Sequence, residues 1–85
     1  MVLMDAQAIE TLFLAEIKAA MARQDISIQG LAKDLGIGRQ TLGKILAGKQ
    51  SLKVQAMITM CFTLDLHPGA TLDLAISRWQ ERRSP

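Results

Sequence analysis

The amino-acid sequence predicts an all-α fold, a compact domain of five helices that spans residues 1–85. Apolar residues recur at helical spacing along most of the chain, and no stretch shows the strict alternation that is typical of a β-strand. Serine, aspartate, glycine and proline occur where helices usually begin and end. Hydrophobic residues make up 49% of the sequence, which is enough for one small domain to bury a core without a metal or a disulfide.

The first helix is predicted from Asp5 to about Arg23. Asp5 can act as its N-cap residue by accepting a hydrogen bond from the first turn. Apolar residues form a stripe along one side of the segment and polar residues lie opposite, as in an amphipathic helix. The stripe contains Ala6, Ile9, Phe13, Ile17, Ala20 and Met21, with Leu12 and Leu14 at its margins.

Two short helices are predicted next, over residues 27–35 and 38–47. Ser27 is a suitable N-cap residue for the first of them. Gly36 and Gly48 follow the last apolar residues of the two segments, where glycine readily adopts the left-handed conformation that ends a helix. The apolar inner faces contain Leu31, Ala32 and Leu35 in the first helix and Leu42, Ile45 and Leu46 in the second.

The fourth helix is predicted from Ser51, as its N-cap residue, to about Leu66. Pro68 and Gly69 interrupt the pattern after it, and Thr71 is expected to open a fifth helix. The fourth helix is rich enough in apolar residues to be central to the core. These residues are Val54, Met57, Ile58, Cys61, Phe62 and Leu64.

The second and third predicted helices form a helix-turn-helix motif over residues 27–48, because a short turn at Gly36 joins them. Four positions have a steric reason for their residue type. Ala32 is small because the next helix crosses close to it, and Gly36 must accept a positive φ. Leu42 and Ile45 anchor the second helix of the motif to the core. This combination of residues at fixed spacing is typical of the motif.

Positive charge is concentrated in the same region. The whole chain has a formal net charge of +2, but residues 33–53 carry five basic residues against Asp34 alone, a local charge of +4. The five are Lys33, Arg39, Lys44, Lys49 and Lys53. This concentration favours a face that binds a polyanion, and a solvated basic face is the alternative interpretation.

The stretch LAKDLGIGRQTLGKILAGK, residues 31–49, resembles the Cro and lambda-repressor-like helix-turn-helix family. SLKVQAMITMCFTLDL, residues 51–66, resembles the helix that follows the motif in that family. The resemblance implies a lambda-repressor-like DNA-binding domain with double-stranded DNA as its partner. It also implies that the second helix of the motif lies in the major groove, while the first crosses the phosphate backbone.

The resemblance further implies which residues contact DNA. Gly38, Arg39, Gln40, Gly43 and Lys44 occupy the contact positions of the family. Arg39 can donate two hydrogen bonds to guanine, and Gln40 can pair with adenine. Gly43 has no side chain on this face, so we expect it to allow close approach of the backbone to DNA.

Other polar side chains near these residues can fix the position of the protein on DNA by contacting phosphates. They are Thr41, Lys44, Lys49 and Ser51. The family often has a glutamine that contacts phosphate at the first motif position. Ile28 occupies that position here and Gln29 follows it, so Gln29 is the candidate for this contact.

These observations predict a sequence-specific transcriptional regulator, a repressor that binds a palindromic operator as a homodimer. A dimer is expected because one recognition helix contacts only a few base pairs. The candidate dimerisation residues, all in the fifth helix, are Leu72, Ile76 and Trp79. Two alternatives are that Trp79 instead closes the core and that the interface includes Leu3, Met4 and Leu12. The alternative function is the antitoxin of a type II toxin–antitoxin module, which would bind a protein toxin as well as its own promoter.

Enzyme, cofactor and metal chemistry have little support in the sequence. Cys61 and His67 are the only residues of their kinds, so the chain has neither an internal disulfide nor a set of zinc ligands. GRQTLGK, residues 38–44, matches the first seven positions of a phosphate-binding P-loop, but Ile45 replaces the hydroxyl residue that binds magnesium. We therefore expect no catalytic activity, no cofactor and no metal. Cys61 is expected in the core, and His67 at the surface or as a capping residue.

The sequence gives no sign of export or of a membrane segment. The opening MVLMDAQAIE lacks the basic segment and the cleavage site of a signal peptide. No apolar run reaches the length of about 18 residues that is needed to span a membrane. We therefore expect a cytoplasmic protein.

Overall fold

The computed structural model describes residues 5–83, which form five helices and, within that range, no strand. The helices are α1 (Ala6–Gln24), α2 (Ile28–Leu35), α3 (Arg39–Leu46), α4 (Val54–Thr63) and α5 (Pro68–Arg83). This arrangement confirms the predicted all-α fold. Leu3 and Met4, named above in an alternative interface, lie outside the described residues. No helix in the described part of the chain is long and apolar enough to cross a membrane.

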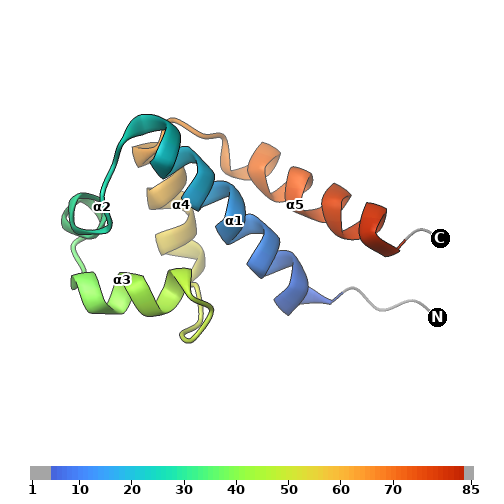
Figure 1. Cartoon of the computed structure of the whole chain (residues 1–85), viewed down its shortest axis with the longest axis horizontal. Coiled ribbons are helices and arrows are strands. Elements are labelled where there is room, and N and C mark those ends of the chain that lie inside the picture. Colours follow the sequence, from blue (N-terminus) through green and yellow to red (C-terminus); the bar gives the residue numbers. More distant parts are fainter. Residues whose placement is uncertain (1–4, 84–85) are drawn as a thin grey trace.

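The helices form two groups in Figure 1. α1 and α5 lie side by side and run in opposite directions, and α4 packs against α5 and α2. α2 and α3 lie together at one end of the longest axis, and the last turn of α5 lies at the other end. The long α1–α5 pair and α4 therefore hold the helix-turn-helix motif at one end of the molecule.

One hydrophobic core joins the five helices, and its largest fully buried side chains are Phe13, Ile17, Leu31, Leu42, Met60, Cys61 and Leu64. α5 adds the buried residues Thr71 and Ala75. Leu12 and Leu14 are both buried, so the inner side of α1 is wider than the predicted stripe. Burial raises the pKa of the Cys61 thiol, against an opposite effect of its hydrogen bond with Thr71. Cys61 therefore stays protonated near neutral pH and acts as a packing residue, as predicted.

Local capping explains why the first three helices begin and end close to the predicted positions. The Asp5 carboxylate accepts a hydrogen bond of 3.1 Å from a backbone N–H in the first turn of α1. The Ser27 hydroxyl accepts one of 3.0 Å from the backbone N–H of Gly30 in α2. Gly36 and Gly48 have φ angles of 71° and 77°, in the left-handed region where glycine avoids the steric cost of a Cβ atom.

The predicted start of α4 is wrong. The helix begins at Val54, after Lys53, and Ser51 is not its N-cap residue. The segment before α4 has no regular secondary structure, and its half-buried Leu52 packs against the core. Lys53, rather than Ser51, is therefore the N-cap residue of α4.

The predicted end of α4 is also wrong, because the helix stops at Thr63 rather than near Leu66. Asp65 has a φ angle of 57°, a left-handed conformation that short polar side chains tolerate better than most. The backbone N–H of Leu66 donates a hydrogen bond of 2.7 Å to the carbonyl oxygen of Cys61. This turn folds Leu66 back against the core before the proline is reached.

α5 begins at Pro68, three residues before the predicted start at Thr71. Proline suits the first turn of a helix because that turn leaves its N–H groups without partners. His67 Nδ1 accepts a hydrogen bond of 3.1 Å from the backbone N–H of Ala70, which confirms the prediction of a surface or capping residue. Pro68 and Gly69 therefore belong to the start of α5 and do not interrupt α4.

Three of the six residues predicted as the core face of α4 are exposed. Val54 and Phe62 are each 67% exposed, and Ile58 is 39% exposed. The fully buried side chains of this region are Met60, Cys61 and Leu64. α4 packs through one side only, against α2 and α5, and no described residue covers the opposite side. The prediction that the whole apolar set is central to the core is therefore wrong.

Candidate nucleic-acid interface

The turn between α2 and α3 fixes the position of α3. Gly36 ends α2 in a left-handed conformation, and Gly38 is the extended N-cap residue of α3. The backbone N–H of Ile37 donates a hydrogen bond of 3.1 Å to the carbonyl oxygen of Ala32, in the last turn of α2. Ala32 is buried, as its predicted place at the helix crossing requires. α3 is therefore held at a fixed angle to α2.

α3 has one buried side and one exposed side. Its buried residues are Leu42, Ile45 and Leu46. Arg39, Gln40 and Lys44 are exposed. Helical spacing places Gln40 and Lys44 opposite the buried residues, whereas Arg39, seven residues before Leu46, lies at the margin of the exposed side. The structure thus brings together three of the side chains that the sequence predicts at DNA.

The positive charges near α3 are available to an external partner. Among residues 5–83, the recorded ion pair joins Arg78 of α5 to Glu16 of α1. Arg39 and Lys44 form no ion pair with any residue of that range. Charges that are not neutralised within the protein attract a polyanion most strongly.

Gly38, Thr41 and Gly43 contribute backbone or short side chains to the same region. Gly38 is exposed, and Thr41 and Gly43 are half-buried. A Cβ atom added at Gly43 would meet no atom within 4 Å, so the fold does not require glycine there. Gly30 differs, because a Cβ atom at that position would lie 3.3 Å from the Ser27 hydroxyl that caps α2. A side chain at position 30 would therefore crowd the cap of α2, which favours glycine there. Packing within the fold gives no such reason for glycine at position 43.

Replacing Gly43 by alanine is expected to raise the free energy of unfolding by about 1 kcal/mol, because alanine favours a helix interior more than glycine does. The midpoint of thermal unfolding, followed by circular dichroism, should rise by roughly 4–8 °C. If the bare backbone at Gly43 approaches DNA, the same variant binds its operator more weakly in a titration. Raised stability with unchanged operator affinity would instead mean that Gly43 makes no DNA contact.

Gln29 and Arg39 line one hollow of about 520 Å³ between α2 and the start of α3. Lys33 lines the same hollow, with Ala32 and Ile37. Lys33 belongs to the basic region that the sequence predicts to bind a polyanion, but it is not among the residues that the family resemblance places at DNA. Its position four residues after Gln29 places both side chains on the same side of α2. This spacing, together with its place in the basic region, is the signal that could have identified it.

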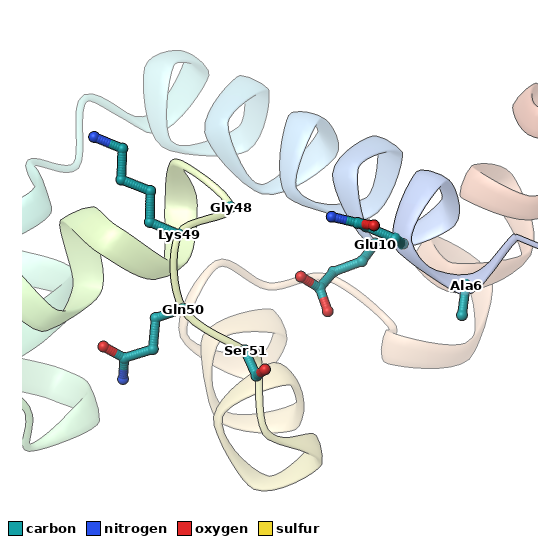
Figure 2. Close-up of a pocket in the computed structure, with 7 residues that line it drawn as sticks. Ala6, Glu10, Gly48, Lys49, Gln50 and Ser51 are labelled. Carbon is teal, nitrogen blue, oxygen red and sulfur yellow. The ribbon is translucent and has the colours of Figure 1, made fainter.

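Lys49 and Ser51 lie in the loop between α3 and α4, which borders a hollow of about 340 Å³ beside the first turns of α1 (Figure 2). Glu10 of α1 lines the same hollow, and its carboxylate points toward the loop in Figure 2. The Lys49 side chain extends away from Glu10, on the other side of the loop. The surroundings of Lys49 therefore suit a phosphate better than those of Ser51 do.

The predicted dimerisation residues Leu72, Ile76 and Trp79 are half-buried and pack against the core. The guanidinium of Arg83 lies over the Trp79 ring, 4.7 Å from its centroid. Leu72 and Ile76 also line an apolar groove beside α4. Each of these side chains is thus partly used to close the core and partly present at the surface.

The fold and the exposed side of α3 define a DNA-binding protein of the helix-turn-helix class. Residues 17–69, more than half of the chain, match the family model described as helix-turn-helix. The chain belongs to the Cro and lambda-repressor-like helix-turn-helix family of DNA-binding transcription regulators. Comparison with curated proteins and with solved structures finds no match.

Proposed function

We propose that this protein is a sequence-specific transcriptional repressor that binds a palindromic operator as a homodimer, with α3 in the major groove. The observation that supports this proposal is the exposed side of α3. It presents Gln40 and Lys44, with exposed Arg39 at its margin in the first turn, from a helix whose opposite side is anchored in the core. A helix held in this way fits the major groove, which is about 12 Å wide.

Arg39 and Gln40 are the residues that read bases. Both lie in the first turn of α3, and the N-terminal residues of a recognition helix are those that reach base edges. Arg39 donates two hydrogen bonds to N7 and O6 of guanine, and Gln40 pairs with N6 and N7 of adenine. Each such pair contributes about 1–3 kcal/mol of discrimination against the wrong base.

Lysine side chains around α3 hold the protein on the phosphate backbone. Lys33, Lys44 and Lys49 are exposed and form no ion pair within residues 5–83. Such contacts fix the position of the protein on DNA without reading its sequence. Neutral donors that assist them are Gln29, Thr41 and Ser51. Ser51 is the weakest of these candidates, because Glu10 shares its hollow and would repel a phosphate.

The homodimer is proposed because one α3 reaches too few base pairs to select a single operator. A two-fold dimer presents two recognition helices to half-sites about 34–36 Å apart, which is one turn of DNA. The dimer also doubles the contact area that one copy makes with DNA. Repression follows because an occupied operator is closed to other proteins.

Selection of bound duplexes from a random DNA pool tests this proposal. The wild type is expected to enrich a palindrome, and its affinity should fall steeply as salt rises, because phosphate contacts release counterions. Arg39→Ala should lose about 1–3 kcal/mol of operator affinity and relax the preference at one position of each half-site. Arg82→Ala removes an exposed arginine from the last turn of α5 and serves as the matched control, with unchanged preference.

Two outcomes would contradict the proposal. If the wild type enriches no sequence, the proposal that the protein binds an operator is wrong. A protein partner, as in the antitoxin alternative, is then the next candidate to test. If the wild type enriches a site without two-fold symmetry, the proposal of a homodimer is wrong, while the proposal of sequence-specific DNA binding stands.

A further inference from the structure

The side of α4 that faces away from the core is apolar along its length. Val54, Ile58 and Phe62 recur at every fourth residue, which places them on one side of the helix. Val54 and Phe62 are the most exposed large apolar residues among those described, each at 67%. We name these three residues the α4 stripe. Single exposed apolar residues are normal on a protein surface, whereas a contiguous row of them marks an interaction site.

The α4 stripe continues into an apolar groove. This groove, of about 250 Å³, lies between α4, α5 and the first half of α1. Its lining includes Val54 and Met57 of α4, Leu72 and Ile76 of α5, and Ile9 and Phe13 of α1. Glu10 is the one charged residue in its lining. Val54 belongs to both the stripe and the groove, so the two form one continuous apolar surface across α4 and α5.

α4 contains no charged residue, but a charged residue lies just beyond each of its two ends. None of the ten residues of the helix is charged. Lys53 immediately precedes α4 and Asp65 lies two residues after it, and both are exposed. Neither forms an ion pair with another residue of the range 5–83. A helix of this length is about 15 Å long, so the stripe has a positive charge at one end and a negative charge at the other.

We propose that the α4 stripe binds a second copy of this chain, with the two α4 helices antiparallel across a two-fold axis. This proposal rests on the homodimer of the proposed function and names the surface that forms it. The stripe of one copy packs on the stripe of the other, and the adjoining groove is covered in the same contact.

The arrangement of charge favours a second copy in this orientation. Antiparallel helices place Lys53 of each copy beside Asp65 of the other, and the two-fold axis forms this pair twice. Parallel helices would instead place like charges together. Because the stripe itself is uncharged, the contact between the two stripes buries no unpaired ion, and Glu10 is the one charge that the covered groove brings into the interface. A two-fold contact of this kind closes after two chains and gives a dimer rather than a filament.

The size of the contact and the position of α3 agree with the same arrangement. A stable interface buries about 1,200–2,000 Å² in total, more than three side chains from each copy supply. The groove extends the surface to Leu72 and Ile76, which are part of the interface predicted from the sequence. The stripe and the groove share no residue with the exposed side of α3, so the contact uses none of the residues proposed to meet DNA.

Sedimentation equilibrium of the full chain without DNA tests the proposal. The wild type should be a dimer at micromolar concentration. Ile58→Glu should raise the dimer dissociation constant at least about thirtyfold, because it places a charge in the centre of the interface. Ile28→Glu is the matched control, since Ile28 is 40% exposed but lies in α2, and its dissociation constant should not change. If Ile58→Glu fails to fold, Phe62→Glu takes its place at a more exposed position of the stripe.

Charge reversal tests the antiparallel orientation. Lys53→Asp should raise the dissociation constant about tenfold, because like charges then meet at both ends of the contact. Asp65→Asn should raise it less, because it removes the attraction without adding repulsion, and asparagine tolerates the left-handed conformation of this position. The Lys53→Asp/Asp65→Asn double variant should bind more tightly than Lys53→Asp alone, because the two aspartates no longer face each other. Lys53→Asp also supplies a better N-cap residue for α4, so its effect cannot come from a weaker helix. A double variant that dimerises no more tightly than Lys53→Asp alone would overturn the antiparallel arrangement.

Operator binding by the same variants separates this proposal from the proposed function. An Ile58→Glu protein that remains a dimer and binds the palindrome would overturn the α4 interface and leave the homodimer standing. A wild type that is monomeric would overturn both the interface and the homodimer. A wild type that enriches no DNA, with a dimer that Ile58→Glu dissociates, would overturn the proposed function and support the interface.

Discussion

Replacing Phe13 by alanine is expected to lower the free energy of unfolding by about 3–5 kcal/mol. Phe13 is the largest fully buried side chain among the described residues, and it lies near the middle of α1, which packs along α5. Removing its ring leaves a cavity that close-packed neighbours fill only in part. The free energy of unfolding of a whole domain is only about 5–15 kcal/mol, so this one change removes a large share of it. Urea denaturation followed by circular dichroism measures the loss.

Leu74→Ala is the control for this prediction. Leu74 also lies in the α1–α5 region, on α5, but it is 40% exposed and outside the hydrophobic core. Its replacement should cost less than about 1 kcal/mol, because partly exposed positions lose less buried surface. Equal losses in Phe13→Ala and Leu74→Ala would mean that α1 does not pack as described.

Replacing Leu42 by alanine is expected to lower the free energy of unfolding by about 2–5 kcal/mol and to weaken operator binding as well. Leu42 is fully buried and anchors α3 to the core. The cavity left by this change lies directly beneath the helix that carries Arg39 and Gln40. α3 can then shift by a fraction of an ångström, enough to misalign paired hydrogen bonds to a base. Denaturation and DNA titration together measure the two effects.

Comparison with Phe13→Ala separates the effect on α3 from loss of the fold. When affinities are corrected for the folded fraction, Phe13→Ala should bind the operator nearly as well as the wild type, and Leu42→Ala should not. Leu42→Met keeps most of the volume and should cost less than about 1.5 kcal/mol, with operator affinity largely preserved. Equal corrected affinities for Leu42→Ala and Phe13→Ala would show that the anchor does not position α3.

The first three helices could be predicted from the sequence because their ends are determined by local interactions. Asp5 and Ser27 cap helices with their own side chains, and Gly36 is needed for a left-handed turn. The limits of α4 and α5 could not be predicted in the same way. They depend on Asp65 in a left-handed conformation and on a cap from His67, two roles that other residue types fill more often.

The burial of α4 was predicted less well than its existence. Its apolar residues surround most of the helix, so helical spacing alone does not determine which side is buried. Contact with α2 and α5 decides this, and the contact buries Met60 and Cys61 while Val54 and Phe62 remain exposed. The excess of apolar residues in the sequence therefore does not enlarge the core and instead leaves an exposed apolar side on α4.

The candidate site was predicted mainly by the family resemblance. Position within the motif indicated Arg39, Gln40 and Lys44, and all three are exposed on α3 in the structure, with Arg39 at the margin of the exposed side. Lys33 was missed because it lies in α2, where the motif assigns it no role. It meets Arg39 only when the turn brings the two helices together around one hollow. Their roles at DNA remain predictions for the binding experiments above.

Trp79 is an intrinsic fluorescent probe in this protein. It is the only tryptophan in the chain, and it is half-buried on α5 with the Arg83 guanidinium over its ring. Its fluorescence emission therefore reports when α5 separates from the core, while circular dichroism reports the loss of all the helices. Coincident curves from the two signals would identify a single cooperative unit. Earlier loss of the tryptophan signal would reveal a step in which α5 detaches while the other helices persist.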